Sequence, residues 1–246
     1  MVTRCRLAPA LAILCSCGTV GPPPVIDPAL SDRVPPATVA LAGVNLDRLR
    51  ASPLYGRLPP TAQAYLTPFA NAHDVLIAST GATLLAIARG TVPGATQVAP
   101  DLALYGAPDL IAAAAAKHPP AAILSLADSA APGHTLWMAI RGGIALPLEG
   151  NAANLNNLLR AAESVTLAIR PDDPAAIDIT ANCPTPDSAQ HFEQTLRALA
   201  SLTVATNSRD PQLASALQAI AITRTDRIVH VALRLPLSAL SSLLAR

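Results

Sequence analysis

The hydrophobic positions in the first half of the chain form short apolar runs, typical of strands, and runs with helical spacing. In chain order they predict a strand, a helix, a β-hairpin, a helix and a strand. This is the βαββαβ order of the ferredoxin-like split motif. Asn45 can cap the first helix, and Gly81 can take the positive φ of the hairpin turn. The predicted strands are 38–44, 74–79, 83–89 and 122–127, the second helix is 109–117, and 94–100 is predicted as loop.

The second half of the chain repeats this order and adds a strand and a helix at its end. Asn151 can cap a helix that carries Leu155 and Leu158 on one face. The clearest amphipathic helix begins at Thr185-Pro186, because a cap residue followed by Pro is a start signal. The predicted strands are 135–141, 164–169, 176–182, 219–223 and 228–235, with a short helix at 213–219 and a last helix after Pro236.

The two halves look like an internal repeat. The segment 72–78 parallels 162–168, about 90 residues later, and each lies where a helix passes into a hairpin. This spacing favours duplication of a domain over a solenoid, whose periods run about 20 to 50 residues. The alternative is one α+β domain in which similar elements recur by chance. We therefore predict an α+β fold of two tandem ferredoxin-like modules with antiparallel sheets, at 37–131 and 132–246, and an extra C-terminal strand and helix.

The N-terminus has the parts of a secretory signal. Arg4 and Arg6 supply positive charge, and 7–14 is an apolar run. This run is far shorter than the roughly 20 residues needed to cross a bilayer, so it is no transmembrane anchor. Prolines are dense from Gly18 to Pro36, which prevents a regular helix and favours an extended spacer. At about 3.1 Å per residue, such a spacer spans up to roughly 60 Å.

The stretch Leu14-Cys15-Ser16-Cys17-Gly18 resembles a bacterial lipoprotein signal, with Leu14 three residues before Cys17 and small Ser16 just before it. The resemblance covers residues 1–18 only. It implies cleavage before Cys17 and attachment of diacylglycerol to that cysteine. The expected order is then a signal peptide at 1–16 and a Pro-rich tether at 17–36, ahead of the two modules. The alternatives are an ordinary signal peptide cut nearby, or incidental thiols in a discarded segment.

Composition narrows the functions that remain open. With 51% hydrophobic and 13% charged residues, the chain can bury a large core. A formal net charge of +1 offers no electrostatic footprint for nucleic acid, and 2% aromatic residues offer few stacking platforms for bases or sugars. The only cysteine beyond Cys17 is Cys183, so a lipidated Cys17 leaves no intrachain disulfide.

The sequence lacks the common motifs of catalysis and cofactor binding: the phosphate loop, the dinucleotide-binding turn, the nucleophile elbow and the zinc-protease helix. Its five histidines form no ligand-like cluster, so we expect no metal and no cofactor. Cys183 and His191 could pair as nucleophile and base, but neighbouring prolines favour Cys183 as a small buried residue. Asp172 and Asp173 lie between prolines, which favours a solvated turn over paired catalytic acids. We therefore expect a protein that is not an enzyme.

Two predicted strand ends carry an arginine next to glycine, at Arg89-Gly90 and at Arg141-Gly142. Arginine can hold a carboxylate or phosphate in bidentate fashion, and glycine permits close approach of the backbone. Trp137, the only tryptophan, lies near the second arginine. These three side chains are the candidate residues of an anionic ligand site in a cleft between the modules. The alternative is that each arginine extends into solvent and that Trp137 belongs to the core.

Three functions remain. The first is a membrane-anchored envelope lipoprotein that binds another envelope protein, or scaffolds an assembly, through exposed sheet faces or edges. The second is a small-ligand binding protein that uses Arg89, Arg141 and Trp137. The third is a hydrolase without a recognisable motif. We expect the first, with Cys17 as the lipidation site and a location on the outer side of the cytoplasmic membrane.

Overall fold

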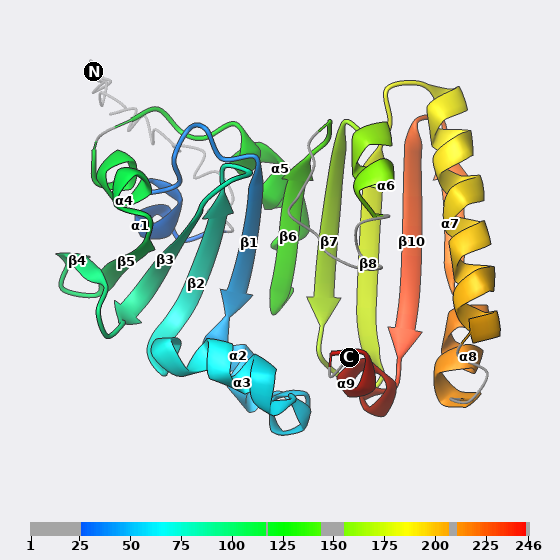
Figure 1. Ribbon diagram of the computed structural model, residues 1–246, viewed down its shortest axis with the longest axis horizontal. Helices are drawn as coiled ribbons and strands as arrows, with labels where there is room; N and C mark the ends of the chain where they lie inside the picture. Colours follow the sequence, from blue (N-terminus) through cyan, green and yellow to red (C-terminus); the bar gives the residue numbers. More distant parts are fainter. Residues whose placement is uncertain (1–25, 117, 144–154, 207–210, 245–246) are drawn as a thin grey trace, which may run out of the picture.

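The computed structural model describes residues 26–116, 118–143, 155–206 and 211–244. Within these ranges ten strands form one sheet, in the order β4-β5-β3-β2-β1-β6-β7-β8-β10-β9 (Figure 1). Every pair of neighbouring strands is antiparallel. The strands are β1 Ala40–Asn45, β2 Asn71–Ser79, β3 Leu84–Thr91, β4 Thr96–Ala99, β5 Leu102–Gly106, β6 Leu136–Arg141, β7 Ser164–Arg170, β8 Ala175–Asn182, β9 Ala221–Thr225 and β10 Ile228–Leu235.

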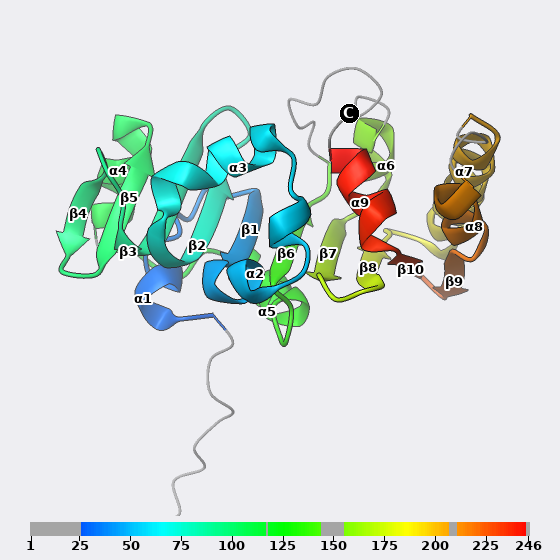
Figure 2. The same cartoon turned by 90° about the horizontal axis from the view of Figure 1, so that it is seen from below.

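Helices lie on both sides of this sheet. They are α1 Pro28–Ser31, α2 Leu46–Ala51, α3 Pro60–Leu66, α4 Pro108–Ala115, α5 Ile123–Ala130, α6 Leu155–Ala161, α7 Pro186–Thr206, α8 Pro211–Gln218 and α9 Leu237–Leu244, with single 3₁₀ turns η1 Tyr55–Arg57 and η2 Thr67–Phe69. Figure 2 shows α3, α6, α7 and α9 on one side of the sheet and α1 and α5 on the other. None of the helices in the described ranges is long and apolar enough to cross a membrane.

The two halves of the sheet have the same strand order when it is read outwards from the middle. β1 pairs with β6 at the centre. Outwards from β1 come β2, β3, β5 and β4, and outwards from β6 come β7, β8, β10 and β9. The repeat inferred from the sequence therefore has a counterpart in the topology.

The α+β class with antiparallel strands is confirmed, but two tandem ferredoxin-like modules are not. In a βαβ unit a crossover helix joins two parallel strands. Here α2 and α3 lie between β1 and β2 in the sequence, yet these two strands are antiparallel neighbours. The predicted modules 37–131 and 132–246 also share one continuous sheet, because β1 and β6 are hydrogen-bonded to each other.

One predicted strand is a helix in the structure, and one predicted loop is a strand. Of the predicted strand 122–127, residues 123–127 belong to α5, in which Ile123, Ala127 and Ala130 are buried at helical spacing. A short apolar run cannot be told from a buried helix segment by periodicity alone. In 94–100, predicted as loop, Thr96–Ala99 form the edge strand β4, whose register against β5 is irregular.

The predicted signals at helix starts and in the first hairpin turn are confirmed. The Asn45 side chain accepts a hydrogen bond from Arg48 N at 2.8 Å and caps α2. Gly81 has a φ of 99° in the turn between β2 and β3. Thr185 Oγ1 accepts from Ser188 N at 3.1 Å in the first turn of α7. The predicted cap Asn151 lies outside the described residues.

Residues 26–34 belong to the folded core, although we predicted a tether that extends to Pro36. Asp27 caps α1, and Ile26, Leu30 and Val34 are buried in one cluster with Leu41 of β1. The density of prolines suggested an extended chain, but Pro28 sits in the first turn of α1, where its missing N–H costs nothing.

The core occupies both faces of the sheet. On the face that carries α1 and α5, Leu41, Ile87 and Leu104 pack against Ile123. On the other face, Leu46 of α2 and Leu237 of α9 belong to one cluster, so the two halves of the chain share a core there. Two smaller clusters on this second face hold α6 and α7 against the strands.

Candidate functional site

A row of apolar side chains crosses the sheet on the face that carries α6, α7 and α9. Directly paired residues of antiparallel strands lie on the same face, so the register brings these side chains into line. Their backbone partners run without interruption from β5 to β8. This apolar row consists of Tyr105, Ala86, Ile77, Ala42, Met138, Leu167 and Ile179.

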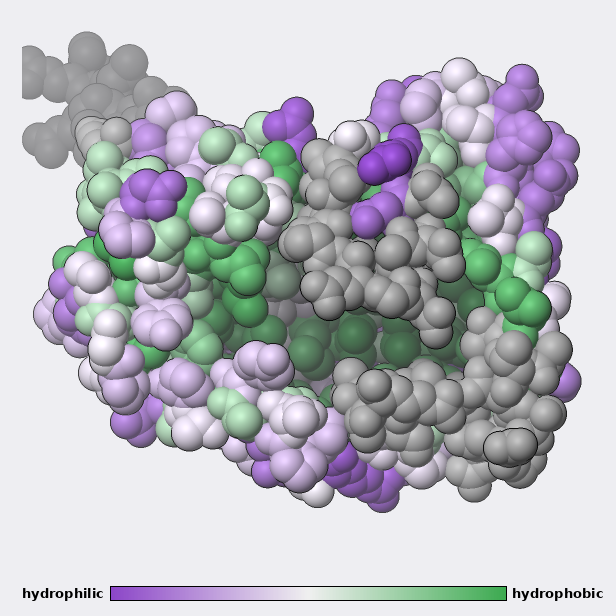
Figure 3. Space-filling view, viewed as in Figure 1, coloured by the Kyte–Doolittle hydropathy of each residue, from purple (hydrophilic) through white to green (hydrophobic). Residues whose placement is uncertain are grey.

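A hollow lies on the face of the sheet that the apolar row crosses (Figure 3). Figure 3 shows hydrophobic residues at the bottom of a depression in this face, with more polar residues below it at the left. Ile77 is 36% exposed and Tyr105 is 49% exposed, whereas Met138 and Leu167 are half-buried. Leu235 packs with Leu237 of α9, Ile140 packs with Leu159 of α6, and Ile179 packs against the cluster that holds α7. The floor of the hollow is therefore apolar and remains partly open.

The opposite face of the C-terminal half is polar. Thr180 there approaches His230 at 3.1 Å, and Asn182 donates to Ser164 at 3.0 Å. Arg170 and Asp178 form a long ion pair of 4.0 Å on the same face. The alternation of apolar and polar residues in 176–182 thus gives β8 one apolar face and one polar face.

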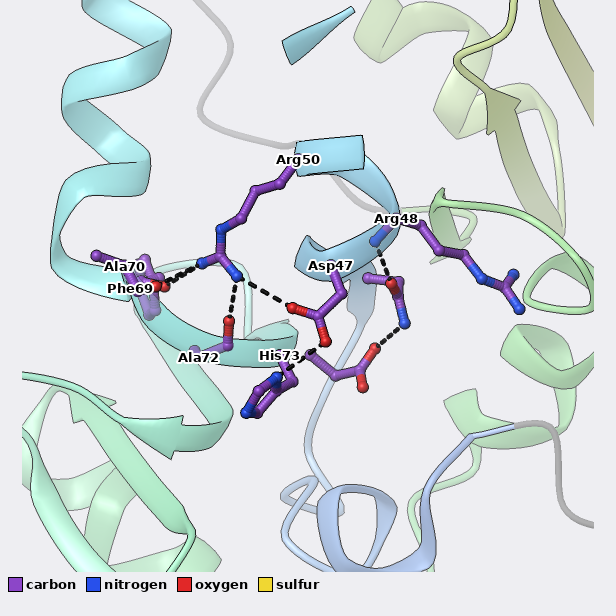
Figure 4. A network of polar contacts seen from close by, with 9 residues as sticks. Asp47, Arg48, Arg50, Phe69, Ala70, Ala72 and His73 are labelled. Carbon is purple, nitrogen blue, oxygen red and sulfur yellow. Dashed lines mark hydrogen bonds and ion pairs between the residues drawn. The ribbon is translucent and has the colours of Figure 1, made fainter. Parts of the chain in front are cut away.

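A polar network lies where β1 passes into α2 (Figure 4). Asp47 accepts from Arg50 Nη1 at 3.2 Å and from His73 Nδ1 at 2.9 Å, as an ion pair when that ring is protonated. Arg50 also donates to the carbonyl oxygens of Phe69, Ala70 and Ala72 at 2.8 to 2.9 Å. These contacts fix the chain that enters β2 against α2.

The Asp74 carboxyl lies next to this network, in a half-buried position. Asn45 Nδ2 donates to Asp74 Oδ1 at 2.7 Å. Burial raises the pKa of Asp74 above its ordinary value, and the negative charges of Asp47 and Asp27 raise it further, against the Asn45 hydrogen bond and the His73 ring. A carboxylate in this position lacks a full set of compensating partners.

A cavity of about 280 Å³ lies beside Asp74, on the face that carries α1 and α5. Asp74, Arg48 and Trp137 are among its lining residues, together with Asn45 and His134. The Trp137 ring lies over Gly43 of the adjacent strand β1.

The structure does not bring Arg89 and Arg141 together. The register aligns Arg89 with Asp74 and Asn45 at one end of the strands, whereas Arg141 follows Ile140 and Ala40 at the other end. This separates them by roughly 20 Å along the strands. The guanidinium of Arg89 already forms two ion pairs, through Nη1 with Asp27 at 2.7 Å and through Nε with Asp101 at 2.8 Å.

The remaining predicted residues have simple positions. Trp137 is buried in the core and lines the cavity, Arg141 is exposed, and Cys17 lies outside the described residues. Cys183 is buried and free, and its burial, with the Glu163 charge, raises the pKa of the thiol, whereas His191 is exposed on α7. Within the described ranges, no three His, Cys, Asp or Glu side chains gather to hold a metal ion.

Asp173 has a role that the sequence did not suggest. It forms an ion pair of 3.7 Å with Arg57 and accepts from Leu237 N at 3.3 Å. The turn between β7 and β8 is thereby linked to the start of α9 and to η1. Sequence reasoning also missed the apolar row and the cavity beside Asp74, because each combines residues from strands that are distant in the sequence.

Comparisons with known proteins bear on the fold alone. No protein-family model and no curated protein matches the sequence. Crystal form III of TP0453 superimposes with a TM-score of 0.55 at 8% sequence identity, over 89% of this chain and 98% of that one. Crystal form I of TP0453 gives a TM-score of 0.50 at 9% identity, with the same coverage of both chains. The chain thus shares its fold with TP0453.

Proposed function

We propose that this chain is a lipid-anchored envelope protein that acts by binding rather than by catalysis, and that the hollow apolar face of its sheet is the docking surface. The observation that carries the proposal is the apolar row. Ile77 and Tyr105 expose large apolar side chains on the face of the sheet that the apolar row crosses. Contiguous apolar patches with a polar rim are typical of interaction sites.

The partner that best suits this surface is the apolar face of another envelope protein. The apolar row includes side chains of five neighbouring strands, from Ile77 on β2 to Ile179 on β8. A broad, shallow apolar surface accommodates an amphipathic helix, whose anchors are spaced at i, i+3 and i+4. The near-neutral net charge of +1 favours such an apolar contact over an electrostatic one.

The anchor is proposed from the sequence around Cys17. Ile26 is already buried in the core. The segment available as a tether therefore runs from Cys17 to Val25 rather than to Pro36. Fully extended, this segment would reach at most roughly 30 Å. Docking would then take place close to the membrane that holds the lipid.

Photo-cross-linking in the native envelope tests the docking surface. Benzoylphenylalanine is placed at Ile77 or Tyr105 in the apolar row, and at exposed His230 on the opposite face as the matched control. We expect a discrete protein adduct from the first two positions, lost when Met138→Asp puts a charge into the apolar row. Equal adducts from both faces would contradict a specific surface, and adducts with lipid alone would replace the protein partner by an acyl chain.

Fatty-acid labelling tests the anchor separately. Wild type and Cys17→Ala are labelled in the cells that make the protein. We expect label in the wild type and none in the variant. Equal labelling of the two proteins would end the lipoprotein proposal and leave the docking surface unaffected.

A further inference from the structure

The cavity beside Asp74 is separate from the proposed docking surface. It opens on the other face of the sheet, between the start of α1, the ends of β1 and β2, and the residues after α5. Its volume of about 280 Å³ lies just below the range of about 300 to 1,000 Å³ typical of drug-sized ligands. It is therefore of a size for a small molecule.

Two opposite charges line this cavity without neutralising each other. Asp74 and Arg48 take part in no ion pair within the described residues, and they do not pair with each other. Figure 4 shows the Arg48 side chain extending away from the Asp47 network. Asp27, the other charged residue of the lining, is held by Arg89 at 2.7 Å. One negative and one positive group thus remain available to a ligand.

Trp137 adds a hydrogen-bond donor to the same cavity. Its side chain is only 8% exposed, and in the described part of the chain its indole Nε1 meets no acceptor. His134 Nδ1, on another lining residue, is also buried without a partner. A buried polar atom that makes no hydrogen bond costs about 1 to 3 kcal/mol, so a ligand that supplies a partner for His134 Nδ1 would be favourable.

We propose that this cavity binds a small zwitterion that carries an ammonium and a carboxylate group, as free amino acids do. The ammonium group lies at Asp74, and the carboxylate lies at Arg48 and Trp137 Nε1. A simple cation would leave Arg48 and the indole unmatched, and a simple anion would meet the Asp74 carboxylate. Only a ligand with both charges satisfies all three groups. This goes beyond the proposed function and does not depend on it.

Tryptophan fluorescence provides a direct test, because Trp137 is the only tryptophan of the chain. The purified full-length chain is titrated with each of the non-aromatic L-amino acids, under excitation selective for tryptophan. L-Alaninamide and N-acetyl-L-alanine serve as analogues that lack one of the two charges. We expect at least one amino acid to give a saturable change, and the two analogues to bind at least about tenfold more weakly than L-alanine or not at all.

Variants decide which residues are responsible. Asp74→Asn and Arg48→Gln should each weaken binding by about 10- to 100-fold, the worth of a charged hydrogen bond. Asp178→Asn, which alters a carboxylate in the other half of the chain, should bind as the wild type does. Since Arg48 is exposed, its variant stays informative even if Asp74→Asn folds poorly. Absence of saturation with every amino acid, or unchanged affinity in Arg48→Gln, would overturn the proposal.

Discussion

At the scale of single residues, the environment of Trp137 depends on a glycine. A Cβ atom added at Gly43 would overlap the ring atoms Cε2 and Cζ2 of Trp137, so a side chain at this position displaces the ring. Gly43 pairs directly with Trp137 across β1 and β6, where the two halves of the sheet meet. Absence of a side chain here lets a large ring fill the space on this face of the sheet.

We therefore predict that Gly43→Ala destabilises the protein by about 1 to 3 kcal/mol through overpacking. The variant should also shift the emission of Trp137. Chemical unfolding followed by fluorescence measures both effects. Gly56→Ala is the control, because a Cβ there meets nothing within 4 Å; equal effects of the two substitutions would contradict the packing argument.

Asp74 gives a second prediction at this scale. Its pKa is raised in the folded protein, mainly by burial, so the fold holds this proton more tightly than the unfolded chain does. Protonated Asp74 therefore stabilises the fold at pH values below 3.8, its ordinary pKa. This stabilisation is lost as the pH rises through the pKa of Asp74 in the folded protein. Asp74→Asn, which stays neutral and can still accept from Asn45, should melt higher than wild type at pH 7. In thermal melts, the higher melting temperature of the variant should fall to that of the wild type near pH 3.8. A difference in melting temperature that stays constant with pH would contradict the prediction.

At the scale of secondary-structure elements, an ionic cluster joins α7 to the edge of the sheet. Glu193 on α7 accepts from Arg197 at 2.9 Å and from Arg224 of β9 at 3.1 Å. Arg197 also donates to the carbonyl oxygen of Ile222 on β9. The hydrogen bonds and charges of Arg197 and Arg224 lower the pKa of Glu193. This cluster occupies a backbone carbonyl of β9, the kind of group that an exposed edge strand offers to another chain.

We predict that Glu193→Gln speeds amide hydrogen exchange in β9 several-fold, because it removes the charge that holds Arg224. Strand β1, in the centre of the sheet, should keep its protection and is the internal control. Because the pKa of Glu193 is lowered in the folded protein, the Glu193 carboxylate stabilises the fold at pH values above 4.5, its ordinary pKa. This stabilisation is lost as the pH falls through the pKa of Glu193 in the folded protein. The difference between wild type and variant should therefore shrink in acid.

At the scale of the whole molecule, the two halves are joined through one sheet and a shared core cluster. β1 and β6 pair over five residues each, and the cluster that holds α9 also contains Leu46 and Val75 from the first half. Asp173 strengthens this connection through Arg57 and the start of α9. A repeat that folded as two independent modules would lack these contacts.

We predict a single unfolding transition, and a large effect of one leucine in the last helix. Leu237 is fully buried in the cluster shared by both halves, so Leu237→Ala should cost about 2 to 5 kcal/mol. Leu202→Ala, at a site 62% exposed, should change stability much less. Calorimetry together with circular dichroism checks both points, and two separate transitions would contradict the single unit.

The sequence by itself determined the local structure. Asn45 and Thr185 start helices, Gly81 makes the turn of the first hairpin, and alternation in 176–182 separates two faces of β8, because these features depend on neighbours within a few residues. The strands of the hairpins β2–β3, β7–β8 and β9–β10 and the long helix α7 follow from the same short-range patterns. The candidate arginines also came from local patterns, but no local pattern states which end of a sheet a residue occupies.

Only the tertiary structure decided which residues that are distant in the sequence lie next to one another. Residues 122–127 became a helix because their apolar side chains face a core built from β1, β3, β5 and β6. The pairing of β1 with β6 turned two predicted modules into one sheet, separated Arg89 from Arg141 and aligned Ile77, Met138 and Leu167 into an apolar row. These outcomes depend on contacts between residues that are far apart in the chain, and a register shift of one residue would have moved each side chain to the other face.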